Sequence, residues 1–140
     1  MTVTAQQRRE IFQRAGKCCE YCRFGGGRQP LSFHVDHVIA LKHGGSDDHD
    51  NLCLACAPCN QHKGAEVAAI DPLTSEATKL FNPRQQKWDE HFQINSDASL
   101  SGITAEGRAT VLVLRMNEEE RVEQRHGETL LGNYPCQTNS

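Results

Sequence analysis

The 140-residue chain lacks a long apolar run, and it lacks a strong excess of positive charge. No stretch approaches the roughly 18 apolar residues of a membrane-spanning helix, so no membrane segment is predicted. The opening residues, MTVTAQQRREIFQ, have no apolar core after their charges, which argues against a secretory signal peptide. We therefore expect a cytoplasmic protein in a reducing compartment, where paired cysteines bind metal more often than they form disulfides.

The net charge of −3 is unevenly distributed along the chain. Residues 1–63 hold eight Lys or Arg against six Asp or Glu, a balance of +2, whereas residues 64–140 hold seven against twelve, a balance of −5. A strongly basic stripe for nucleic-acid binding is therefore absent. Any phosphate-binding surface is expected in the first half and should be modest.

The length and the spacing of apolar residues indicate one small domain with appendages. A core of this size is commonly stabilised further by a disulfide or a structural metal ion. Apolar residues recur at helical spacing near the start, and they alternate with polar residues after a glycine-rich loop. The first-half elements predicted in this way are a helix over 5–15 capped by Thr4, a strand through Leu31, Phe33 and Val35, a strand over 51–54, and a helix between Pro58 and Gly64.

The second half carries weaker signals. Turns are predicted at Asp71-Pro72 and Asn82-Pro83. Residues 104–116 have the pattern of a helix, and Asn117 followed by three glutamates resembles the start of another. The bulky side chains of this half are interpreted as core rather than as base-stacking platforms; they are Phe81, Trp88 and Phe92.

Four of the seven cysteines form two Cys-x-x-Cys pairs. Two thiolates at this spacing can hold one face of a tetrahedral ion, and a second pair completes the four-sulfur shell of structural zinc. The predicted ligands are Cys19, Cys22, Cys56 and Cys59, with 33 residues inserted between the pairs. The alternatives for these cysteines are small buried side chains or a redox pair.

The other three cysteines have no ligand spacing. Cys53 alternates with leucines in a predicted strand and is expected in the core, and Cys136 lies close to the C-terminus. Cys18 is adjacent to the first pair, so it remains an alternative to Cys19 as a zinc ligand.

Residues suited to phosphodiester hydrolysis lie in and just after the insert between the cysteine pairs. This reaction needs a base to activate water and a cation to neutralise the phosphate and the departing oxygen. Asp36 and Asn60 offer hard oxygen ligands for Mg²⁺ or Mn²⁺. Histidine side chains titrate near neutral pH, so the neighbouring His37 is able to accept a proton.

The order of these residues resembles the HNH endonuclease family, whose motif combines Cys-x-x-Cys pairs with Asp-His, Gly-Gly, Asn-Leu and Cys-x-x-Cys-Asn. The matching text is CEYC, VDHVIALKHGG and DNLCLACAPCNQHKG, within roughly residues 14–64. DPLT, LFNPR and GITAEGRATV extend the likeness to stand-alone bacterial members to about residue 125.

The resemblance implies an α+β fold: a small ββα-metal (HNH or His-Me finger) core stapled by a zinc site of four cysteines, with flanking helices. It implies a single nuclease domain over 1–125, with the core at about 14–64 and an extension at about 65–125. Residues 126–140 are then predicted to form a flexible tail.

The resemblance also implies a metal-dependent endonuclease that acts on DNA. His37 would be the general base, Asp36 and Asn60 would bind the catalytic Mg²⁺ or Mn²⁺, and Asn51 would fix the loop and the imidazole. The zinc would be structural and separate. Asn60 stands where many members have histidine, which weakens the case for a transition metal at the catalytic site.

Basic residues near the motif are candidates for contacts with the DNA backbone, with solvated surface charge as the alternative. They are Lys63, Lys42 and Arg84. Cleavage of both strands by a single active site would require a homodimer or two successive nicks, and no dimer interface is identifiable in the sequence.

Two rival functions use the same cysteines. One is a zinc-stabilised nucleic-acid-binding or adaptor module without catalysis, which has no need of Asp36 and His37. The other is a rubredoxin-like redox protein, which has no need of the insert. The presence of Asp36, His37, Asn51 and Asn60 in order favours the nuclease.

Overall fold

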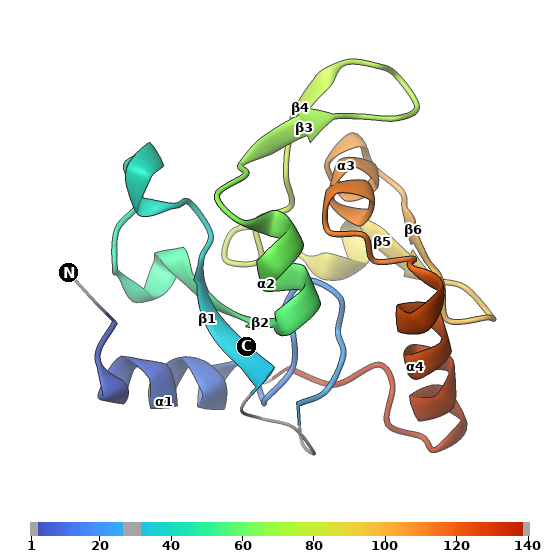
Figure 1. Cartoon of the computed structure of the whole chain (residues 1–140), viewed down its shortest axis with the longest axis horizontal. Helices are drawn as coiled ribbons and strands as arrows, with labels where there is room; N and C mark the ends of the chain where they lie inside the picture. Colours follow the sequence, from blue (N-terminus) through green and yellow to red (C-terminus); the bar gives the residue numbers. More distant parts are fainter. Residues whose placement is uncertain (1–2, 27–31, 139–140) are drawn as a thin grey trace.

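The computed structural model describes residues 3–26 and 32–138 (Figure 1). These residues contain both helices and short antiparallel strands, so the predicted α+β class is confirmed. No helix within them is long and apolar enough to cross a membrane. The elements are α1 (Ala5–Arg14), β1 (Phe33–His37), β2 (Leu52–Cys56), α2 (Ala57–Lys63), β3 (Ala68–Ile70), β4 (Ala77–Lys79), β5 (Phe92–Ile94), β6 (Leu100–Gly102), α3 (Ala105–Val113) and α4 (Glu119–Leu130), with 3-10 turns η2 (Leu41–His43), η3 (His49–Asn51) and η4 (Trp88–Glu90).

The first helix forms where the sequence predicts it. The Thr4 hydroxyl accepts a hydrogen bond from the Gln7 amide, and the Gln7 side chain accepts one from the Thr4 amide, which completes a capping box. Ile11 is fully buried and anchors the helix to the core. Gly16, in the left-handed conformation with φ of 63°, follows the end of the helix.

The strands β1 and β2 pair antiparallel, and α2 follows directly (Figure 1). Asp36 lies opposite Cys53, and His37 lies opposite Leu52. All five residues of β2 are buried because α1 and α2 both pack against it. Pro58 lies in the first turn of α2 and Gly64 follows its end, as predicted. The predicted strand residue Leu31 lies outside the described residues.

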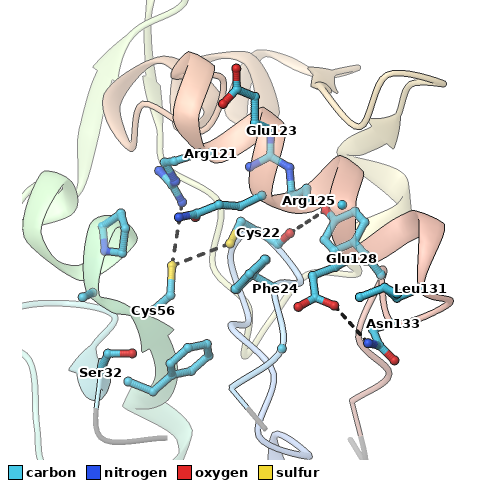
Figure 2. Close-up of a pocket in the computed structure, with 17 residues that line it drawn as sticks. Cys22, Phe24, Ser32, Cys56, Arg121, Glu123, Arg125, Glu128, Leu131 and Asn133 are labelled. Atoms are coloured by element: carbon cyan, nitrogen blue, oxygen red, sulfur yellow. Dashed lines mark hydrogen bonds between the residues drawn. The ribbon is translucent and has the colours of Figure 1, made fainter. Parts of the chain in front are cut away.

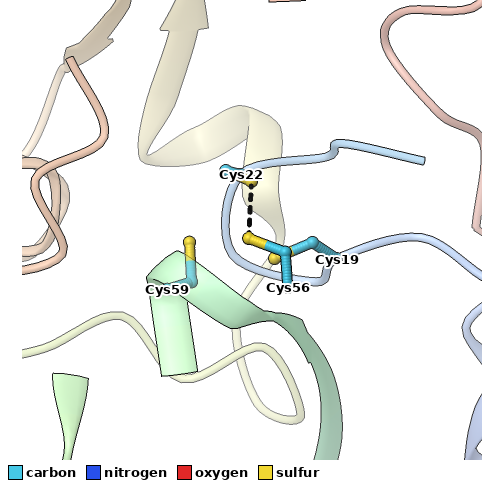
Figure 3. Close-up of side chains that lie close together, drawn as sticks. All are labelled: Cys19, Cys22, Cys56 and Cys59. Atoms are coloured by element: carbon cyan, nitrogen blue, oxygen red, sulfur yellow. Dashed lines mark hydrogen bonds between the residues drawn. The ribbon is translucent and has the colours of Figure 1, made fainter. Parts of the chain in front are cut away.

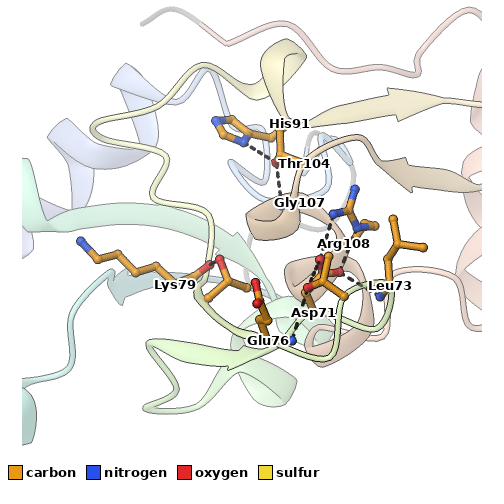
Figure 4. A network of polar contacts seen from close by, with 10 residues as sticks. Asp71, Leu73, Glu76, Lys79, His91, Thr104, Gly107 and Arg108 are labelled. Carbon is orange, nitrogen blue, oxygen red and sulfur yellow. Dashed lines mark hydrogen bonds and ion pairs between the residues drawn. The ribbon is translucent and has the colours of Figure 1, made fainter.

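The segment after α2 is built from two hairpins and two helices. The β3–β4 hairpin packs against α3, and Asp71, which follows β3, joins the two through Arg108 (Figure 4). The Arg108 guanidinium donates to both Asp71 carboxylate oxygens, at 2.9 and 2.8 Å. Asp71 also accepts from the Leu73 amide, so one buried carboxylate closes the turn and binds the helix.

One hydrophobic core connects the β1–β2–α2 unit with this later segment. The Trp88 and Phe92 rings stack at 5.0 Å, and Phe81 meets Phe92 edge-on at 5.1 Å. All three side chains are buried, which confirms that they belong to the core. The Trp88 indole NH donates to the Tyr21 carbonyl at 2.8 Å and so joins this aromatic group to the first cysteine pair.

The C-terminal residues differ from the flexible tail that the sequence predicts. The helix α4 continues to Leu130, and Tyr134 is buried with its hydroxyl donating to the Cys22 carbonyl at 2.7 Å. Cys136 forms a disulfide with Cys18. These contacts lie far apart in sequence, so the local pattern of the last 15 residues gives no sign of them. Asn117 does not cap α4, because its amide instead bonds the backbone of Leu100.

Candidate metal centre and active site

The four predicted cysteine ligands come together in one buried cluster (Figure 3). Cys19 and Cys22 lie on the turn after α1, Cys56 ends β2, and Cys59 lies in α2. Their sulfur atoms all lie within 4.8 Å of one another. β2 pairs with β1, and α2 begins directly after Cys56. This arrangement positions Cys56 and Cys59 beside Cys19 and Cys22.

The cluster fits a tetrahedral zinc ion. The Cys22 and Cys56 sulfurs are 3.7 Å apart. Zinc–sulfur bonds of about 2.3 Å place neighbouring sulfurs about 3.8 Å apart in a tetrahedron. Burial raises the pKa values of Cys19 and Cys59 well above the usual range, whereas hydrogen bonds from the neighbouring cysteines, led by Cys19, lower that of Cys22. The four sulfurs and their separations therefore fit a tetrahedral zinc ion.

The other cysteines have different environments. Cys18 is bonded to Cys136 and is not part of the cluster, which resolves the alternative between Cys18 and Cys19. The disulfide joins two cysteines outside the two Cys-x-x-Cys pairs, to which the expectation of metal binding applied. Cys53 is fully buried in β2, as predicted, and burial raises the pKa of its thiol.

Asp36 lies near the end of β1, with only 7% of its surface exposed. Its Oδ2 atom accepts a hydrogen bond from the Tyr21 hydroxyl at 2.8 Å and lies 3.1 Å from the Lys63 ammonium. Burial raises the pKa of Asp36, and Lys63 and Tyr21 oppose that rise. Among the described residues the polar partners of this carboxylate all use Oδ2, which leaves Oδ1 for a ligand.

The imidazole of His37 is held by a carboxylate that sequence analysis did not single out. His37 Nε2 lies 2.7 Å from Asp47 Oδ1, and the Asp47 side chain is only 11% exposed. Asp47 lies in a turn-rich run with Asp48 and Asp50, and nothing in the sequence distinguishes these three. Gln7 of α1 donates to the Asp47 carbonyl at 3.0 Å, which ties the first helix to this loop.

Asn51 fixes the loop between β1 and β2. Its amide accepts from the Ile39 NH at 2.9 Å and donates to the carbonyls of Ile39 and Ser46. A Cβ at Gly45 would lie 1.8 Å from the Ile39 carbonyl oxygen, so only glycine fits. Asn51 therefore shapes the loop as predicted, but the imidazole is held by Asp47 and not by Asn51.

Asn60 lies half-buried on α2, the helix that packs against β1 and its Asp36. Its backbone carbonyl accepts from the Gly64 amide where the helix ends. Asn60 and the pair Asp36 and His37 therefore belong to the same β1–β2–α2 unit.

Two of the three predicted phosphate contacts are internal. Lys63 is 2% exposed, and its ammonium also donates to the His37 carbonyl at 3.0 Å, so it supports the site from within. Arg84 pairs with Glu20 of the first cysteine turn, and burial lowers the pKa of Arg84 to about 10. Only Lys42, on η2, has an exposed side chain. Spacing alone does not indicate which basic residues are buried.

Tyr21 was also missed by sequence analysis. It occupies one of the two positions between Cys19 and Cys22, and its hydroxyl reaches Asp36. Tyr21 therefore links the turn that carries the first cysteine pair to Asp36.

A cavity of about 980 Å³ opens beside the cysteine cluster rather than at Asp36 (Figure 2). Its walls come from the start of β1, the start of α2 and one side of α4. Cys22, Cys56, Arg121 and Tyr134 are among the lining residues.

Comparison with known families identifies the segment that contains both sites. Residues 19–66 match the model of the HNH endonuclease family. No curated protein and no solved structure matches the chain. The matched segment contains the four clustered cysteines together with Asp36, His37, Asn51 and Asn60, and it ends before β3. Over this segment the resemblance to the HNH endonuclease family is confirmed.

Proposed function

We propose that the protein is a metal-dependent endonuclease that hydrolyses phosphodiester bonds in DNA, with a ββα-metal core formed by β1, β2 and α2. The observation that carries the proposal is the arrangement at the end of β1. There Asp36 lies beside His37, and a second carboxylate, Asp47, holds the imidazole.

In this proposal His37 is the general base. A carboxylate that accepts the proton of Nε2 favours the tautomer in which Nδ1 carries a free lone pair. Nδ1 has no hydrogen-bond partner within residues 3–26 and 32–138, and the side chain is 24% exposed. Asp47 thus acts as a positioning residue that leaves Nδ1 ready to take a proton from water.

Asp36 and Asn60 are the proposed ligands of the catalytic divalent ion. Their carboxylate and amide oxygens are hard donors of the kind that Mg²⁺ and Mn²⁺ prefer. A bound cation would neutralise charge on the phosphate and on the departing oxygen. Tyr21 and Lys63 hold Asp36 Oδ2 and so orient its carboxylate, and Lys63 also donates to the backbone carbonyl of His37.

The four-cysteine cluster is the proposed structural zinc site. Its ligands join the turn after α1 to the β2–α2 junction. Loss of zinc would therefore release Tyr21 from its contact with Asp36, and it would loosen the start of α2, the helix that carries Asn60. DNA is the proposed substrate because of the family match and the exposed Lys42 on the loop that follows β1.

The test is cleavage of supercoiled plasmid after bound zinc has been measured. Wild type is expected to nick plasmid with added Mg²⁺ or Mn²⁺ and not in EDTA, whereas His37→Ala is inactive with unchanged zinc content. The matched control is His126→Ala, which removes an exposed histidine of α4. Undiminished nicking by His37→Ala would overturn the assignment of the base.

A non-catalytic, zinc-stabilised nucleic-acid-binding module is the second candidate. It is favoured by the ion pair of Asp36 with Lys63, since that pair by itself satisfies a buried carboxylate. A zinc-loaded protein that retards DNA in a gel but cleaves none with Mg²⁺ or Mn²⁺ would support this candidate over the nuclease.

A further inference from the structure

A buried arginine from α4 lies against the cysteine cluster. Arg121 is 7% exposed, and its Nη2 atom lies 2.9 Å from the Cys59 sulfur and 3.7 Å from the Cys56 sulfur. Figure 2 shows its guanidinium directed at the Cys56 sulfur, with a dashed line between the two. Arg121 lies well outside the segment that matches the HNH family, so the motif does not account for it.

The guanidinium is held in this orientation by the backbone. Its Nη1 atom donates to the carbonyls of Leu114 and Arg115, at 2.6 and 3.0 Å. These carbonyls follow the end of α3, where helical carbonyls lack intrahelical partners. The planar guanidinium has several N–H donors, so it can donate to these carbonyls through one nitrogen and to the sulfurs through another.

The charges of the two partners are complementary. Within the described residues the hydrogen-bond acceptors of Arg121 are two carbonyls and two sulfurs, and none is a carboxylate. A buried cation needs a compensating negative charge. Four thiolates around a divalent ion carry a net charge of −2, which also needs compensation in a buried site.

We propose that Arg121 is an outer-sphere partner of the four-cysteine metal centre, which neutralises part of the thiolate charge and makes α4 part of the zinc site. The inference rests on the proposed zinc centre. Residues that hydrogen-bond metal ligands typically change metal affinity by about 10- to 100-fold when they are removed. The extension after residue 66 therefore contributes directly to zinc retention.

The chain offers a matched control on the same helix. Arg125 lies one turn after Arg121, is likewise buried, and donates to the Ala98 carbonyl at 2.8 Å. Its other side-chain partner is Asn117, and within the described part of the chain none of the hydrogen-bond partners of Arg125 is a sulfur. Replacing Arg125 removes a buried guanidinium from α4 and leaves the thiolate charge unchanged.

The experiment compares wild type, Arg121→Met, Arg121→Lys and Arg125→Met as zinc-loaded, full-length proteins. Zinc content is measured first, and zinc transfer to a chromophoric chelator at constant pH then gives the affinity of each protein. Arg121→Met is expected to bind zinc about 10- to 100-fold more weakly, Arg121→Lys to lie between it and wild type, and Arg125→Met to match wild type. Should Arg121→Met not fold, the ranking of Arg121→Lys below Arg125→Met carries the same test.

The outcomes separate this inference from the zinc centre itself. A wild type that binds no zinc would overturn the proposed zinc centre. A zinc-binding wild type with unchanged affinity in both Arg121 variants would overturn the role of Arg121 alone. Equal weakening in the Arg121 and Arg125 variants would also overturn it, because general loosening of α4 would then be the cause.

Discussion

The HNH segment, residues 19–66, and the extension after it, residues 67–138, differ in what they contribute. The segment contains the side chains with proposed chemistry: the cysteine cluster, Asp36, His37 and Asn60. The extension lies outside the matched segment, yet its side chains contact the segment at several points. Trp88 and Tyr134 bind carbonyls of the first cysteine turn, Arg84 pairs with Glu20, and Arg121 reaches the cluster.

The HNH segment of this chain therefore depends on the extension for part of its core. A segment of 48 residues, 19–66, is too short to bury much of its own surface. The extension completes its core and satisfies its buried carbonyls. We therefore expect changes in the segment to affect metal binding and chemistry, and changes in the extension to act through stability, Arg121 excepted.

The largest expected effect comes from removing one zinc ligand. Cys56→Ser should lose zinc and cooperative folding, because structural zinc contributes on the order of 10 kcal/mol in small metal-stabilised domains. Thermal unfolding and zinc content measure the change. Cys53→Ala, a buried cysteine three residues earlier and outside the cluster, serves as control and should keep its zinc. A stably folded, zinc-free Cys56→Ser protein would refute the structural role.

The next effect separates activity from stability. Asp47→Asn should reduce plasmid cleavage on the order of 100-fold, since the imidazole loses the partner that fixes its orientation. Zinc content and the unfolding midpoint should hardly change. Asp48→Asn, at an exposed neighbouring aspartate, should cleave at the wild-type rate. Equal activities in the two variants would remove Asp47 from the site.

A pH-dependent effect belongs to the extension. The Arg108 guanidinium holds the pKa of Asp71 well below its usual range. Because the folded-state pKa is depressed, the stability from this pair is present above the unfolded value of about 3.9 and is lost as pH falls further. Asp71→Asn should therefore lower the unfolding midpoint at pH 7 more than at pH 3. Glu66→Gln, at an exposed site, is the control. If Asp71→Asn lowers the unfolding midpoint equally at pH 7 and pH 3, the result would contradict this account.

The smallest effect concerns the surface. Lys42→Ala should weaken DNA binding modestly. It should also reduce the slope of log affinity against log salt by about 1, the amount expected for the loss of one phosphate contact. Lys87→Ala removes an exposed lysine of the extension and should leave that slope unchanged. If both variants behave alike, the substrate surface is not confined to the HNH segment.

The sequence predicted what local spacing determines. The cysteine quartet, the helix capped by Thr4, the two strands and the short helix from Pro58 to Gly64 all follow from periodicity, turn residues and ligand spacing. The structure places them where they were expected.

Long-range partners were not predictable in the same way. Asp47 lies among three similar aspartates, and the burial of Lys63 and Arg84 depends on packing that single-sequence spacing does not encode. Tyr134 and Cys136 contact residues more than 110 positions away, so their segment has no local pattern to detect. Arg121 lies among glutamates on an otherwise polar helix, where arginines are ordinarily solvated.

The most direct test of the central claim is the plasmid-nicking rate of His37→Ala relative to wild type, measured in Mg²⁺ at equal zinc occupancy. The account predicts a loss of about 100-fold or more, as expected when a general base is removed. Equal rates would show that the Asp36–His37 site does not carry the reaction.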